Sequence, residues 1–269
     1  MTNDEKVGTS NDPSPSKSPQ KGGFAAGGGA SQRGLWVGLF AKHWTPGATK
    51  TRLAASIGPE AAAAVSHAFV ETTLERVGGL RQGVTERVLA FTPCDQAEAF
   101  ESLVASHSGD WRCEPQAEGD LGQRMQSFFA DALGQAACAL LIGSDSPHLP
   151  LEAVTEAAAW LNEPAGGDRL VLGPTEDGGY WLIGVRGSLP PIFDRMPWSR
   201  EELLTETVSR LVEAGRIEGR DYRLIEPWYD VDEADDLQRM RRELRGDDPA
   251  LNDLADRLDA LLGPLDETH

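Results

Sequence analysis

The chain has 269 residues, of which 43 are acidic and 25 basic, and its formal net charge of −18 argues against nucleic acid or an anionic membrane as a partner. Its three cysteines are widely spaced, which disfavours a disulfide framework or a zinc–thiolate site, and its five histidines show no metal-binding spacing. No apolar run approaches the roughly 18 residues that a membrane-spanning helix needs.

The first 33 residues are rich in Ser, Gly, Pro and Asn and show no hydrophobic periodicity. We therefore predict a disordered tail at residues 1–33. This tail lacks the apolar core of a secretory signal, so we expect a cytoplasmic protein. The remainder suits one large α/β domain, which we place at residues 34–246. A C-terminal helix at residues 247–269 repeats leucine, and we expect it to pack on the domain or on a partner, which allows a homodimer.

Apolar runs and amphipathic segments alternate along the chain. Short apolar runs predict strands at residues 35–42, 86–93, 111–115, 137–143, 168–174, 180–185 and 222–227. Helical spacing of apolar residues predicts helices at residues 60–77, 95–105, 120–133, 151–161, 201–214, 233–244 and 251–262. The connection T-E-D-G-G between the fifth and sixth strands is too short for a helical crossover, so these two strands should be antiparallel. We predict a mainly parallel mixed sheet between helical layers, which binds ligands beyond the carboxyl ends of its strands.

The segment after the first predicted strand is basic. It contains Lys42, Lys50 and Arg52 and no acidic residue. A turn at Pro46 and Gly47 can direct backbone N–H groups toward an anion. Arg52 can bind phosphate oxygens bidentately, whereas Lys50 would act as a point charge. We expect a phosphate-binding loop here, and the alternative is a solvated loop whose basic residues pair with neighbouring acids.

Carboxylates follow two of the predicted strands. Asp145 comes just after the apolar strand at residues 137–143, and Asp230 and Asp232 follow the last strand in Y-D-V-D, where an extended chain would point both the same way. A like-charge pair about 4 Å apart costs roughly 4 kcal/mol at an effective dielectric constant of about 20, unless a cation lies between the two charges. We therefore predict that Asp145, Asp230 and Asp232 hold Mg²⁺ or Mn²⁺, which bridges to substrate phosphates. Helix caps and turns are the alternative explanation of these residues.

Two further motifs are candidates for substrate contact. In the hairpin connection, Gly178 and Gly179 would let the backbone approach a sugar or acceptor, and Asp177 could bind hydroxyls or act as a base. The same D-G-G sequence is also a turn signal. Asp120 and Arg124 lie one helical turn apart at a predicted helix start, so Arg124 either binds a nucleotide phosphate or pairs with Asp120.

Taken in order, these segments resemble a known family. The motifs are K-x-x-x-P-G-x-x-K-T-R-L, Q-x-x-G-D-L-G-x-R-M, G-S-D-S-P-x-L, L-G-P-x-E-D-G-G-Y-x-L-I-G, W-S and Y-D-V-D-x-x-D-D-L, which begin at Lys42, Gln116, Gly143, Leu172, Trp198 and Tyr229. From about Leu35 to Leu244, the chain resembles the GT-A-like glycosyltransferases associated with arsenosugar biosynthesis. That family is related to sugar-nucleotide transferases and, more distantly, to nucleotidyltransferases.

The resemblance implies a nucleotide-diphospho-sugar transferase fold in which Asp145 is the metal-binding aspartate and the pair Asp230 and Asp232 lies across the site. Two positions depart from the family pattern. Trp44 stands where proline is usual, and His148 stands where an acidic residue is common. Both lie beside expected ligand loops, so they bear on the preference for base or acceptor.

We therefore predict a metal-dependent glycosyltransferase that uses a nucleotide-diphospho-sugar donor and a small-molecule acceptor. Asp145, Asp177 and Lys50 would be catalytic. The expected substrate-binding residues are Lys42, Lys50, Arg52, Arg124, Gly178 and Gly179. The alternative is a nucleotidyltransferase that joins a nucleoside monophosphate from a nucleoside triphosphate to a phosphorylated small molecule and releases pyrophosphate. A nucleotide-binding protein without turnover is the third hypothesis.

Overall fold

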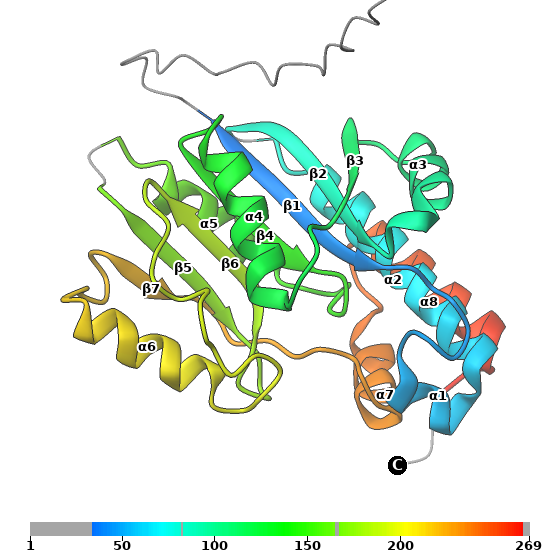
Figure 1. The fold of residues 1–269 in the computed structure, drawn as a ribbon. Coiled ribbons are helices and arrows are strands. Elements are labelled where there is room, and N and C mark those ends of the chain that lie inside the picture. Colours follow the sequence, from blue (N-terminus) through cyan, green and yellow to red (C-terminus); the bar gives the residue numbers. More distant parts are fainter. Residues whose placement is uncertain (1–33, 82, 165–166, 266–269) are drawn as a thin grey trace, which may run out of the picture. The chain divides into compact units, whose positions relative to one another are not determined.

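The computed structural model describes residues 34–81, 83–164 and 167–265, so the tail predicted at residues 1–33 lies outside the described residues. A seven-stranded sheet has the order β3-β2-β1-β4-β6-β5-β7 (Figure 1). The strands are β1 (Leu35–Lys42), β2 (Val84–Thr92), β3 (Trp111–Pro115), β4 (Cys138–Gly143), β5 (Arg169–Pro174), β6 (Tyr180–Arg186) and β7 (Tyr222–Leu224). Parallel ladders join β1 to β2 and β4, β2 to β3, and β5 to β7, whereas β6 is antiparallel to β4 and β5. The predicted α/β class, mainly parallel sheet and antiparallel hairpin are confirmed.

Helices cover both faces of this sheet. The described helices are α1 (Thr51–Ile57), α2 (Pro59–Gly78), α3 (Ala97–Ala105), α4 (Leu121–Leu133), α5 (Leu151–Leu161), α6 (Leu203–Glu213), α7 (Ala234–Glu243) and α8 (Pro249–Leu262), with a 3-10 turn η1 (Cys94–Gln96) before α3. Val37 and Leu39 of β1 share an apolar cluster with α2, α3 and α5, whereas Trp36 shares another with α4 and α6. Successive strand residues point to opposite faces, so β1 is apolar throughout because both faces are covered.

A third apolar cluster joins α1, α2, α7 and α8. Leu254 and Leu258 of α8 are fully buried in it, so the last helix packs on its own chain, the first of the two arrangements that its leucines allow. Among the described residues, no helix combines the length and the apolar character needed to cross a membrane.

The chain returns from β7, at the edge of the sheet, to α7 through residues 225–233, which we call the connector (Figure 1). The Trp228 amide donates to the Pro174 carbonyl at 2.9 Å, and the Val231 amide donates to the Asp145 carbonyl at 3.0 Å. The connector therefore contacts the carboxyl end of β5 and the segment that follows β4. The strand predicted at residues 222–227 ends earlier, at Leu224, and Pro227 in the lost part has no N–H to give to a ladder.

Candidate active site

A cavity of about 370 Å³ lies at the carboxyl ends of β1, β2 and β4. Six of the residues predicted to form the site line it, namely Lys42, Lys50, Arg52, Arg124, Asp145 and Asp232. They come from the last residue of β1 and the segment after it, from α1 and α4, from the segment after β4 and from the connector. This edge is where open α/β sheets bind ligands, and the volume falls in the range of small-molecule sites.

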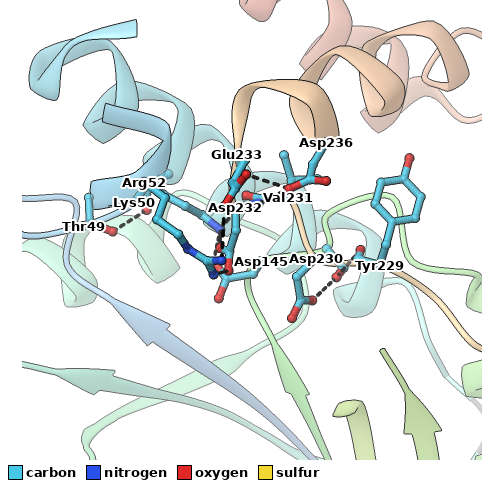
Figure 2. A network of polar contacts seen from close by, with 12 residues as sticks. Thr49, Lys50, Arg52, Asp145, Tyr229, Asp230, Val231, Asp232, Glu233 and Asp236 are labelled. Carbon is cyan, nitrogen blue, oxygen red and sulfur yellow. Dashed lines mark hydrogen bonds and ion pairs between the residues drawn. The ribbon is translucent and has the colours of Figure 1, made fainter. Parts of the chain in front are cut away.

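Lys50 joins the basic segment to the two acidic segments (Figure 2). Its ammonium forms an ion pair with Asp145, and it donates to Asp232 Oδ1 at 3.0 Å and to the Val231 carbonyl oxygen at 2.8 Å. An ammonium has three N–H donors, so these three acceptors satisfy it. The Lys50 side chain is only 4% exposed. Burial by itself would lower the pKa of Lys50, but the attraction of Asp145 and Asp232 outweighs it and raises that pKa, so Lys50 is a cation.

The backbone of Lys50 is in the left-handed region, with φ 46° and ψ 47°, directly before α1. This conformation costs a residue with a Cβ roughly 1–2 kcal/mol. The sequence predicts a loop from Lys42 to Leu53, whereas α1 begins at Thr51. The helix was missed because it has only seven residues, and its N-cap makes no side-chain hydrogen bond.

Arg52 extends the same network toward solvent. Its guanidinium pairs with Asp232 and lies 3.4 Å from Glu233 Oε1. The Arg52 side chain is 63% exposed, so these pairs contribute little to stability. Lys50 and Arg52, two of the basic residues expected to bind substrate, therefore contact carboxylates in this structure.

Asp230 has different surroundings from Asp145 and Asp232. Its carboxylate accepts a hydrogen bond from Ser146 Oγ at 2.6 Å, and it is not among the residues that line the cavity. Burial, together with the charge of Asp145, raises the pKa of Asp230 to about 7. The expectation that Asp230 and Asp232 point the same way assumed an extended strand. The structure has no strand at these two residues, and their carboxylates contact Ser146 and Lys50 respectively, so the shared direction stays a prediction.

A divalent cation fits Asp145 and Asp232. In the part of the chain that the structure describes, no group of three or more His, Cys, Asp or Glu side chains could hold a metal ion. Mg²⁺ does not need such a cage, because it is usually bound by one or two carboxylates together with substrate phosphates and water. Both carboxylates contact the same ammonium, so they already reach one common positive charge. The charge of Lys50 also acts on Asp230, but these two groups form no ion pair among the described residues.

Two more basic side chains face the cavity from other segments. Arg124 Nε donates to the Gly119 carbonyl at 2.9 Å, and Lys42 Nζ donates to the Ala48 carbonyl at 2.6 Å. Asp120 caps α4 through its side chain. In the described part of the chain, Lys42 and Arg124 thus each donate to a backbone carbonyl and not to a carboxylate.

Gln116 was predicted only as the first residue of a motif and not as a site residue, yet its side chain lines the cavity. The side-chain amide of Gln116 donates to the Ala90 carbonyl at 2.9 Å, and its Oε1 lies 3.4 Å from Nη1 of Arg124. Its place directly after β3, at the carboxyl end of a parallel strand, was the signal that could have identified it.

Asp177, Gly178 and Gly179 are not among the cavity-lining residues. The Asp177 carboxylate accepts from the Gly179 amide at 3.2 Å, which makes it a turn residue. Gly178 has φ +88°, and a Cβ there would lie 2.1 Å from the Glu201 carbonyl oxygen, so only glycine fits. The turn explains the D-G-G sequence, and a role toward the acceptor stays a prediction.

Comparison with protein families gives one match. Residues 74–200 match the model of the family described as an uncharacterized protein conserved in bacteria (DUF2064). This range runs from α2 to the segment before α6 and includes Asp145, but it leaves out Lys50 and Asp232. None of the curated proteins matches the chain.

Solved structures match most of the chain. A candidate nucleotide-diphospho-sugar transferase from Desulfovibrio desulfuricans G20 is 27% identical, with a TM-score of 0.72 over 86% of this chain and 99% of that chain. A 4-diphosphocytidyl-2C-methyl-D-erythritol synthase from Anaerococcus prevotii DSM 20548 is 9% identical, with a TM-score of 0.50 over 76% and 93% of the two chains. A cytidylyltransferase from Leptospira borgpetersenii serovar Hardjo-bovis is 12% identical, with a TM-score of 0.50 over 88% and 100%.

These likenesses establish the fold predicted from the sequence, that of nucleotide-diphospho-sugar transferases and cytidylyltransferases. None of the three names refers to arsenosugar biosynthesis, so that part of the resemblance stays a prediction.

Proposed function

We propose that this chain is a metal-dependent glycosyltransferase that transfers a sugar from a nucleotide-diphospho-sugar to a small-molecule acceptor in the cytoplasm. The observation that carries the proposal is the meeting of Lys50, Asp145 and Asp232 in one cavity at the carboxyl ends of parallel strands. A site for a metal–diphosphate needs carboxylates for the ion and basic groups for the phosphates. The fold shared with a candidate nucleotide-diphospho-sugar transferase at 27% identity supports the same substrate class.

In this reaction, the bond between the anomeric carbon and the diphosphate oxygen breaks, and the acceptor oxygen forms the new bond and loses its proton. Asp145 and Asp232 would hold Mg²⁺ or Mn²⁺, and the bound ion supplies Lewis-acid stabilisation of the leaving diphosphate. Lys50 and Arg52 neutralise the remaining phosphate charge, which is largest as the bond breaks. Asp177 and the glycines after it are our sequence-based proposal for the acceptor side.

The second candidate is nucleotidyl transfer. A phosphate oxygen of the acceptor would attack the α-phosphorus of a nucleoside triphosphate, and pyrophosphate would leave with the electrons of the broken P–O bond. The basic lining of the cavity favours this reaction, because a triphosphate carries more negative charge than a diphospho-sugar. The cavity-lining basic residues are Lys42, Lys50, Arg52 and Arg124.

A ligand screen with turnover assays tests both candidates. Nucleotide sugars and nucleoside triphosphates are each added with Mn²⁺, and a ligand that binds the folded chain raises its melting temperature. Release of nucleoside diphosphate from a nucleotide sugar identifies the first reaction, and release of pyrophosphate identifies the second.

Asp145→Asn should abolish the metal-dependent part of the melting-temperature shift and lower turnover at least about 100-fold, the usual scale for loss of transition-state charge stabilisation. The matched control is Asp131→Asn, because Asp131 is exposed on α4 and does not line the cavity. Equal behaviour of the two variants would remove Asp145 from the site. Absence of any metal-dependent shift or turnover in the wild type would refute the proposed function.

A further inference from the structure

Four charged groups of the cavity already neutralise one another. The carboxylates that fit a divalent ion, Asp145 and Asp232, both contact the Lys50 ammonium, and Asp232 also pairs with Arg52. Two of the cations that fit phosphate are therefore the partners of the carboxylates that fit the metal ion.

Because Lys50 is buried, it is unfavourable for a metal ion alone or a phosphate alone to break this arrangement. With 4% of its side chain exposed, Lys50 has little access to water, and its three donors are satisfied only by Asp145, Asp232 and the Val231 carbonyl. A metal ion that took the two carboxylates would leave a buried ammonium without its anionic partners. A phosphate that took Lys50 would leave two neighbouring carboxylates without their shared cation, but these side chains are 51% and 33% exposed, and Asp232 keeps its contact with Arg52. The larger cost falls on the ammonium, because removing the partners of a buried charge leaves it uncompensated.

Binding of both ligands together avoids these costs. The metal ion replaces the ammonium at the carboxylates, and the phosphate replaces the carboxylates at Lys50. Lys50 lines the cavity together with Asp145 and Asp232, so the ammonium has space in which to meet a ligand phosphate. All charges are paired before and after the exchange.

We propose that Lys50 is the resident cation of this site, and that a divalent ion displaces it from Asp145 and Asp232 only when a phosphate accepts the released ammonium. This inference rests on the proposed function and specifies how its ligands bind. Metal and phosphate binding are then coupled, and by linkage each raises the affinity for the other by the same factor. The metal ion alone binds weakly, because it must compete with a lysine of the protein itself.

The test measures binding of Mn²⁺ alone to the full-length chain by electron paramagnetic resonance of the free ion. Lys50→Met removes the competing ammonium, so the dissociation constant for Mn²⁺ should fall at least about tenfold, a coupling of ordinary size. Lys42→Met is the matched control. It removes the same charge from the same cavity, but Lys42 donates to the Ala48 carbonyl and not to the carboxylates. An effect in Lys50→Met no larger than that in Lys42→Met would overturn the inference.

A second measurement uses the wild type and needs no folded variant. Equilibrium dialysis of the full-length chain against Mn²⁺ should show little retained ion at micromolar concentration. Addition of inorganic pyrophosphate should raise the retained Mn²⁺ at least about tenfold. Saturable micromolar binding of Mn²⁺ without pyrophosphate would overturn the inference even if the chain transfers sugars. Coupled binding without any transfer reaction would leave the inference in place and refute the proposed function.

Discussion

In the glycosyltransferase family that this sequence resembles, an acidic residue is common at the position of His148. Its ring lies 5.2 Å from that of Trp228 and 4.5 Å from that of Tyr229, and neither ring nitrogen has a hydrogen-bond partner among the described residues. Burial, together with the charges of Arg76 and Arg239, lowers the pKa of His148 to about 3. An acidic side chain here would add negative charge three residues from Asp145, whereas a neutral imidazole adds none.

The low pKa of His148 makes stability depend on pH. The unfolded chain binds a proton at this residue below pH 6.5, the ordinary value, whereas the folded chain does so only near pH 3. As the pH falls from 6.5 to 3, His148 therefore lowers the free energy of unfolding by about 1.4 kcal/mol for each pH unit. His148→Phe should not show this loss. The difference in free energy of unfolding between His148→Phe and the wild type should therefore change by about 2 kcal/mol in favour of the variant when the pH is lowered from 7 to 5.

Urea unfolding of both proteins at the two pH values measures this change. The other titrating groups are common to both chains, so their contributions largely cancel in the difference. A difference between variant and wild type that is the same at pH 7 and pH 5 would contradict the buried, neutral state of His148.

At the scale of helices and strands, α8 shows a clear division between buried and exposed leucines. Leu258 is fully buried against α2 and α7, whereas Leu261 is 42% exposed on the same helix. Leu258→Ala should lower the free energy of unfolding by about 2–5 kcal/mol, since it leaves a cavity. Leu261→Ala should change it by no more than about 0.5 kcal/mol. Equal effects in chemical denaturation would show that α8 does not belong to the cooperative fold.

The strands that were predicted best are those with continuous apolar runs. The prediction for β1 has the observed bounds, and that for β4 differs by one residue, because strands buried on both faces need no polar alternation. Elements set by tertiary contacts were harder to predict. The short helix α1 has too few residues for periodicity to appear, and β7 is shortened where the connector leaves the sheet.

In the site, too, some features follow from local sequence patterns and others depend on tertiary contacts. The position of Asp145 was predictable because it follows β4, and the carboxyl ends of parallel strands converge at one edge of the sheet. Asp232 reaches the same cavity through the connector, after β7 has ended at Leu224. The contact of Lys50 with both depends on its left-handed backbone, on α1 and on the path of the connector, none of which leaves a local sequence pattern. The hydrogen bond of Asp230 depends on Ser146, which follows Asp145 in another segment.

At the scale of the whole molecule, the charge of −18 opposes the approach of any phosphate ligand. Lys50 and Arg52 do not offset it before binding, because carboxylates already neutralise them. The association rate of a nucleotide ligand should therefore rise severalfold as salt shortens the screening length from about 30 Å at 0.01 M to about 8 Å at 0.15 M.

Stopped-flow measurements with a fluorescent nucleotide analogue and saturating Mg²⁺ would follow this rate. A nucleotide association rate that falls with salt would show that a local positive potential governs the encounter.

The pairing of Lys50 with Asp232 spans 182 positions in the sequence, and this separation bears on how the protein is made. Translation proceeds from the N-terminus, so Lys50 and the first strands emerge from the ribosome long before the connector does. A nascent chain can begin to form its sheet while its lysine still lacks one of its two acidic partners. A product released before residue 232 would lack Asp232 and also α7 and α8, which share the third apolar cluster with α1 and α2. Premature termination should therefore remove part of the core together with the carboxylate pair that we propose for the metal ion.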